Sequence, residues 1–85
     1  INRVIHQAVE RNEPPIQGRR RLRVYYATRV SSRPFTVLAF VNDPGLMPVN
    51  YRRYLEGVLR RSFGIRAAPV RLRLRARTRK EEERE

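Results

Sequence analysis

The spacing of apolar residues along the chain predicts two helices. In the first, apolar positions recur every three or four residues, and the pattern stops at Asn12, before two consecutive prolines. In the second, Asn50 is placed to cap the N-terminus and Gly64 to end the helix in the left-handed conformation. The first apolar stripe comprises Ile1, Ile5, Ala8 and Val9. The second comprises Tyr51, Tyr54, Leu55, Val58, Leu59 and Phe63.

Three further segments have the patterns of strands. Residues 22–29 alternate, after a basic loop at residues 18–21, and the alternation puts Arg23, Tyr25, Ala27 and Arg29 on the outward face. Residues 35–41 are almost continuously apolar, which is typical of a central strand. Residues 69–77 alternate strictly, with Val70, Leu72, Leu74 and Ala76 on one face and arginines on the other.

The element order is therefore α-β-β-α-β, which predicts an α+β fold. Two helices cannot cover both faces of a three-stranded sheet, so we expect both to pack on one face. Residues 1–77 form one domain with this fold in our interpretation, and residues 78–85, which are charged and contain no apolar residue, form a disordered tail.

The charge balance points to a polyanionic partner. The chain has 85 residues, with 20 lysines and arginines against eight acidic residues, a formal charge of +12. The excess belongs to the folded part, because residues 1–68 already hold thirteen arginines and four acidic residues. On the last strand, alternate residues lie about 6.6 Å apart. Arg71, Arg73, Arg75 and Arg77 would thus form a ladder that follows a phosphate backbone, although such a row can also be an ordinary solvated face.

Three groups of arginines are the candidate nucleic-acid-binding residues. They are Arg19, Arg20, Arg21 and Arg23 before and within the first strand, Arg53, Arg60 and Arg61 on the second helix, and Arg71, Arg73 and Arg75 on the last strand. Gly57 shares a helix side with the second group, where its missing side chain could let a phosphate approach.

The outward sheet face is also a candidate docking surface. Tyr25 and Ala27 are its predicted residues on the first strand. One apolar set of the second strand must join them, either Phe35, Val37, Ala39 and Val41 or Leu38 and Phe40. Such a face could stack bases or dock onto a neighbouring domain, and we favour docking.

Several kinds of chemistry lack the residues they require. The chain has no cysteine and a single histidine, His6, so neither a cysteine nor a histidine zinc site can be built. It has no G-x-x-x-x-G-K-[ST] loop for nucleotide phosphates, and its one lysine is Lys80 in the tail. The apolar runs are too short to span a bilayer. We expect no catalytic residues, no metal, no small-molecule substrate, no membrane contact and a cytoplasmic setting.

Several strings resemble the C-terminal KH-like domain of the Der or EngA double-GTPase family. They are Tyr26-Ala27-Thr28, Phe40-Val41-Asn42-Asp43-Pro44, Tyr51-x-Arg53-Tyr54-Leu55-Glu56, Leu59-Arg60, Phe63-Gly64 and Pro69-Val70-Arg71-Leu72. The resemblance implies a parent protein with two tandem GTPase domains that acts in assembly of the large ribosomal subunit and contacts ribosomal RNA. It also implies that GTP and Mg²⁺ bind to those GTPase domains, with no cofactor here. The chain, which starts at Ile1, is then a piece of a larger protein.

One departure from KH domains bears on mechanism. The G-x-x-G loop that clamps nucleotide backbones does not occur among Gly18, Gly45, Gly57 and Gly64. Two hypotheses therefore stand: an RNA-binding module that uses its arginines, and a protein-interaction module that docks onto the GTPase domains of the same parent chain.

Overall fold

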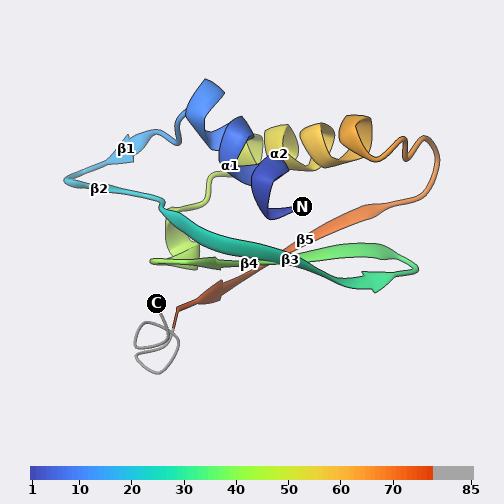
Figure 1. Cartoon of the computed structure of the whole chain (residues 1–85). Coiled ribbons are helices and arrows are strands. Elements are labelled where there is room, and N and C mark those ends of the chain that lie inside the picture. Colours follow the sequence, from blue (N-terminus) through green and yellow to red (C-terminus); the bar gives the residue numbers. More distant parts are fainter. Residues whose placement is uncertain (78–85) are drawn as a thin grey trace.

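Two helices lie side by side over one face of a three-stranded sheet in the computed structural model, which describes residues 1–77 (Figure 1). The helices are α1 (Asn2–Arg11) and α2 (Val49–Ser62), and the strands, in spatial order, are β3 (Val24–Ser32), β4 (Phe35–Val41) and β5 (Val70–Ala76). β3 pairs antiparallel with β4, and β4 pairs parallel with β5. The predicted α+β fold, with both helices on one face, is confirmed. The predicted tail, residues 78–85, lies outside the described residues.

Two short elements were not predicted. The basic loop is part of a hairpin of β1 (Ile16–Gln17) and β2 (Arg20–Arg21), and a 3₁₀ helix, η1 (Pro44–Leu46), follows β4. Gly18 has a φ of +64° at the first of the two turn positions, as in type II′ hairpins. Strands of two residues are too short to show an alternation of apolar and polar positions, so the pattern could not predict them.

The hydrophobic core lies between the sheet and the helices. Ile5 from α1 and Leu55 and Leu59 from α2 meet Val37 and Val41 from β4, and all five are almost completely buried. Burying a side chain of this size contributes about 1.5–3 kcal/mol. Because these valines point toward the helices, the intervening side chains of β4 point to the open face of the sheet, which the helices leave uncovered. This arrangement resolves the alternative for the second strand: Leu38 and Phe40 belong to the open face.

A bulge in β3 reverses the faces predicted for the middle of that strand. Val24 is opposite Val41 and Tyr26 is opposite Phe40, so Tyr25 is an extra residue in the ladder. After the bulge, Ala27 points into the core, with 2% of its surface exposed, whereas Tyr26 is 48% exposed. The prediction that Ala27 faces outward is therefore wrong. Tyr25 stays outside the core.

The two ends of α2 differ from each other in how well the sequence predicted them. The Arg52 N–H donates to the Pro48 carbonyl at 3.0 Å, so the helix starts at Val49 with Pro48 as its N-cap. The prediction of Asn50 as N-cap is wrong for that reason. Gly64 has a φ of +64°, and the Ile65 N–H donates to the Arg60 carbonyl at 2.9 Å. This bond belongs to a Schellman motif, and the prediction for Gly64 is confirmed.

Side chains of the two helices form hydrogen bonds to backbone groups of both edge strands of the sheet. The Ala27 N–H donates to Asn2 Oδ1 at 2.9 Å at the β3 edge. At the β5 edge, Arg52 Nη1 donates to the Leu72 carbonyl. Unpaired groups on edge strands are templates for pairing with another chain. These two bonds fix each helix to its edge strand and remove one such group from each edge.

Two tyrosine hydroxyls join the helices. Tyr51 Oη donates to the Asn12 carbonyl and Tyr54 Oη to the Ala8 carbonyl, each at 2.7 Å. The rings contact each other, with centroids 5.5 Å apart. Both residues therefore belong to the helix–helix contact, as their place in the apolar stripe predicted.

We expect stability to fall in alkaline solution through Tyr51. Burial raises the pKa of its hydroxyl from 10.0 to about 12, and Tyr54 and Glu13 add to the rise. Between pH 10 and pH 12 the unfolded chain loses this proton first, so the free energy of unfolding should fall by about 2 kcal/mol. Urea unfolding across this range would measure the fall. Tyr51→Phe loses a hydrogen bond, so its free energy of unfolding below pH 10 should be about 1 kcal/mol lower. This variant should not show the alkaline fall, and an equal fall in it would contradict the assignment of the effect to Tyr51.

Candidate nucleic-acid interface

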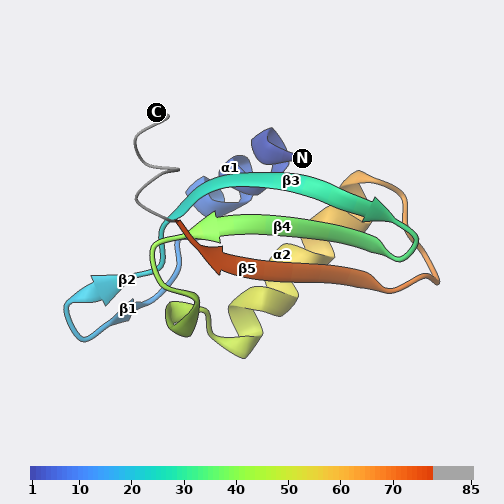
Figure 2. The same cartoon turned by 90° about the horizontal axis from the view of Figure 1, so that it is seen from below.

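The open face of the sheet combines arginines with aromatic and aliphatic residues. Figure 2 views this face, with the helices behind the strands. The pairing of the strands places its side chains in rows that run across the sheet. The rows are Tyr26, Phe40 and Arg75; Thr28, Leu38 and Arg73; and Ser31, Thr36 and Arg71. Each row thus ends in an exposed arginine of β5.

We call Arg71, Arg73 and Arg75 the arginine ladder. Neither β3, β4 nor β5 contains an acidic residue. Within residues 1–77, the side chains of the ladder have no carboxylate partner, because the two ion pairs found there join Arg20 to Asp43 and Arg21 to Glu13. A regular row of guanidinium groups on a surface without carboxylates attracts phosphate.

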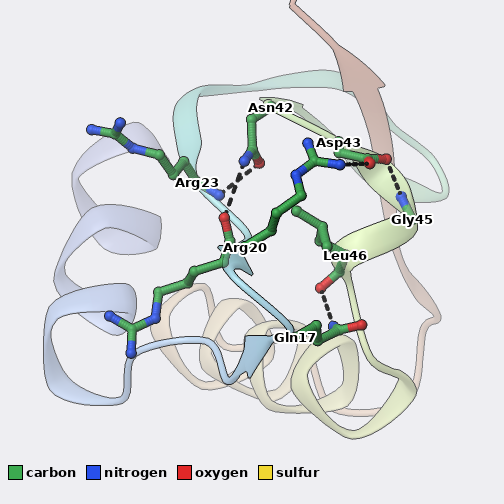
Figure 3. Close-up of polar contacts among 8 residues, drawn as sticks. Gln17, Arg20, Arg23, Asn42, Asp43, Gly45 and Leu46 are labelled. Atoms are coloured by element: carbon green, nitrogen blue, oxygen red, sulfur yellow. Dashed lines mark hydrogen bonds and ion pairs between the residues drawn. The ribbon is translucent and has the colours of Figure 1, made fainter.

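The basic hairpin is fixed to the turn after β4 (Figure 3). Asn42 Oδ1 accepts from the Arg23 N–H at 2.8 Å, and Asn42 Nδ2 donates to the Arg21 carbonyl at 3.0 Å. Asp43 accepts from the Gly45 N–H at 2.9 Å, as a turn-forming aspartate does, and also pairs with Arg20 at 2.9 Å. The turn thereby fixes the position of the hairpin relative to the sheet.

This fixation uses part of the positive charge predicted for binding. Arg20 and Arg21 each contact a carboxylate, the latter that of Glu13 at 3.1 Å. Such exposed pairs contribute little to stability but reduce the local positive potential. Arg19 and Arg23 have no such partner among the described residues. Of the four arginines in and just after the hairpin, these two are the best suited to a phosphate contact.

The arginines of α2 lie on the helical side of the molecule, opposite the open face. Arg60 Nη1 donates to the Ala68 carbonyl at 2.9 Å and so holds the loop that leads to β5. A side chain at Gly57 would come within 3.3 Å of Arg61 Nη1, so a guanidinium group occupies the space beside this glycine. Arg53 is exposed. The ten predicted arginines are therefore divided among the ladder, the hairpin and α2, and their role in binding stays a prediction.

Sequence reasoning missed the aromatic pair of the open face. Tyr26 was assigned to the core by alternation, and the bulge in β3 reverses that assignment. Phe40 was one of two alternatives, and the structure places it beside Tyr26, with ring centroids 6.4 Å apart. Nothing in the local pattern predicts the bulge.

Comparison with known proteins identifies the family. The model for the KH-domain-like, C-terminal region of EngA bacterial GTPase enzymes matches residues 1–75. The chain belongs to this family. The matched region is thus the KH-like part of these proteins rather than a GTPase domain, and the resemblance in the sequence is confirmed.

Curated relatives agree with this assignment. The chain is 49% identical to GTPase Der of Natranaerobius thermophilus over 72 residues. This match covers 85% of the chain and 16% of that protein. It is 46% identical to GTPase Der of Cyanothece sp. over 99% of the chain, and 47% identical to GTPase Der of Desulfitobacterium hafniense over 100% of the chain. Each of these two matches covers 19% of the relative. The chain therefore spans less than one fifth of the length of these relatives.

Residues 1–77 lack two features of other functional classes. In that part of the chain, no helix is both long enough and apolar enough to cross a membrane. Within the same residues, no three histidine, cysteine or acidic side chains are grouped as a metal site requires.

Proposed function

We propose that this chain is an RNA-binding module of a GTPase of the EngA family, and that it contacts ribosomal RNA of a large-subunit precursor. The observation that carries the proposal is the arginine ladder on an open sheet face whose strands contain no acidic residue. The GTPase domains of the parent chain would bind GTP and Mg²⁺, and this module would place them on the RNA.

The mechanism is electrostatic contact with the sugar-phosphate backbone. Each arginine that neutralises a phosphate releases condensed counterions, which supplies affinity without sequence specificity. The rigid guanidinium fork can also form two parallel bonds to one phosphate. Since the chain lacks the G-x-x-G clamp, we infer that RNA is held across the open sheet face.

Docking of a GTPase domain onto the open face is the alternative. It would use the same surface, where Tyr25, Tyr26, Leu38 and Phe40 supply apolar area. The ladder favours RNA over a docked protein domain. Its three arginines lack carboxylate partners among residues 1–77, so a protein that covered them would need a matching acidic surface.

We expect binding of structured ribosomal RNA to weaken steeply with salt. Three ladder contacts give a slope of about −2.7 in a plot of log affinity against log salt concentration, and further contacts make it steeper. Fluorescence anisotropy of a labelled RNA stem-loop, titrated with the 85-residue chain at several salt concentrations, measures this slope. A slope near zero, or a strong preference for one short sequence, would contradict backbone binding.

A further inference from the structure

Two aromatic rings lie next to each other on the open face, beside the arginine ladder. Tyr26 of β3 and Phe40 of β4 are direct cross-strand partners, with ring centroids 6.4 Å apart and an angle of 36° between the rings. Arg75 pairs with Phe40 from the other side, so one row of the sheet reads tyrosine, phenylalanine, arginine.

The aromatic pair does not belong to the hydrophobic core. Neither ring is part of the cluster between the sheet and the helices, and Tyr26 is 48% exposed. Tyr26 is also one of the residues that line a shallow hollow of about 550 Å³ at the β3 edge, where the exposed Arg29 supplies a further positive charge. Packing of the core therefore does not explain why aromatic residues stand at these positions.

The other aromatic rings are engaged elsewhere. The Arg77 guanidinium lies 3.6 Å from the centroid of the Tyr25 ring and covers one of its faces. The Phe63 ring packs on Phe35, at 5.5 Å. Tyr51 and Tyr54 lie in the contact between the helices. Within residues 1–77, Tyr26 and Phe40 are thus the aromatic pair that includes an exposed residue and lies on the open face beside the arginine ladder.

We propose that Tyr26 and Phe40 form a stacking platform for unpaired RNA bases, while Arg73 and Arg75 hold the adjoining phosphates. The inference rests on the proposed function, because it names the part of the RNA that occupies the open face. Base stacking on aromatic side chains tolerates any sequence, since every base has a π-face. The open face would therefore select single-stranded segments next to structured RNA. Apolar rings beside a row of cations match the bases and phosphates of such a segment.

The test compares RNA with and without bases. Binding of a short uridine oligomer to the 85-residue chain is measured alongside an abasic ribose-phosphate oligomer of the same length. We expect the uridine oligomer to bind about tenfold more tightly. Tyr26→Leu should remove most of that difference and leave binding of the abasic oligomer unchanged, and Tyr26→Trp should restore it. Val49→Ala, which alters an exposed apolar residue of α2 on the helical side, is the control and should change neither affinity.

The outcomes separate this inference from the proposed function. Equal affinity for the two oligomers, with no effect of Tyr26→Leu, would overturn the stacking platform, and a steep salt dependence of both would still support backbone binding. Equal losses in Tyr26→Leu and Val49→Ala would also overturn it. Absence of binding to either oligomer and to the stem-loop would overturn both proposals. Circular dichroism confirms that each variant is folded.

Discussion

Replacing Arg71, Arg73 and Arg75 together by glutamine is expected to weaken RNA binding about 100- to 500-fold at about 0.1 M salt. Each lost phosphate contact removes about 0.7–0.9 from the salt slope, and near 0.1 M salt that equals slightly less than a factor of ten in affinity. The slope itself should fall by about 2–2.7. Because the three side chains are exposed on β5, the fold should keep its stability.

The matched control removes the same charge from the helical side. Arg3, Arg53 and Arg61 are exposed and have no carboxylate partner among residues 1–77, and their joint replacement by glutamine leaves the open face intact. This variant should lose much less affinity. A second control deletes residues 78–85, whose basic residues are accompanied by four glutamates. Equal losses in the two triple-glutamine variants would mean that total charge, not the ladder, determines binding.

Ala27→Glu is expected to destabilise the domain strongly, whereas Tyr26→Glu should leave its stability nearly unchanged. Ala27 is 2% exposed, opposite Ala39, which is equally buried. A carboxylate there is unpaired and displaces core side chains, at a cost of at least about 3 kcal/mol. The total stability expected for a chain of this length is about 4–13 kcal/mol. Tyr26 points to solvent on the open face, where a charge is hydrated. Chemical denaturation of both variants measures the difference.

The same pair of substitutions distinguishes the bulged strand from a regular one. With strict alternation in residues 22–29, Tyr26 would face the helices and Ala27 the solvent, and the effects would be exchanged. A strongly destabilised Tyr26→Glu beside a stable Ala27→Glu would therefore contradict the register of β3 and, with it, the composition of the open face.

Regular alternation explains what could be predicted of the fold. β5 follows its pattern throughout, so the ladder could be read from the sequence before its neighbours were known. The side chains of β4 that face the helices are buried, and Leu38 and Phe40 on the other side are half-buried. A run of apolar residues predicts such a strand but does not show which residues face the helices. In β3, one extra residue exchanges the faces, and the hydrogen bond from Ala27 to Asn2 fixes the new register. That partner is 25 positions away in the sequence and could not be predicted from local spacing.

The candidate site was predictable in kind but not in arrangement. The composition predicted a polyanionic partner, and the sequence pattern indicated which arginines could bind it. Neither could show that Arg60 holds a loop or that Arg20 and Arg21 contact carboxylates. These are tertiary contacts between segments separated by turns of unpredicted geometry. The pairing of Tyr26 with Phe40 likewise depends on the register of two strands.

Nuclear magnetic resonance of the arginine side chains gives the most direct test of whether RNA lies on the open sheet face. The Nε–Hε resonances of the 85-residue chain would be followed during titration with the RNA stem-loop. Our account predicts that the resonances of Arg71, Arg73 and Arg75 shift and saturate together, whereas those of Arg53 and Arg61 stay nearly unchanged. Shifts confined to Arg53 and Arg61, with the ladder unchanged, would place RNA on the helical side and contradict the account.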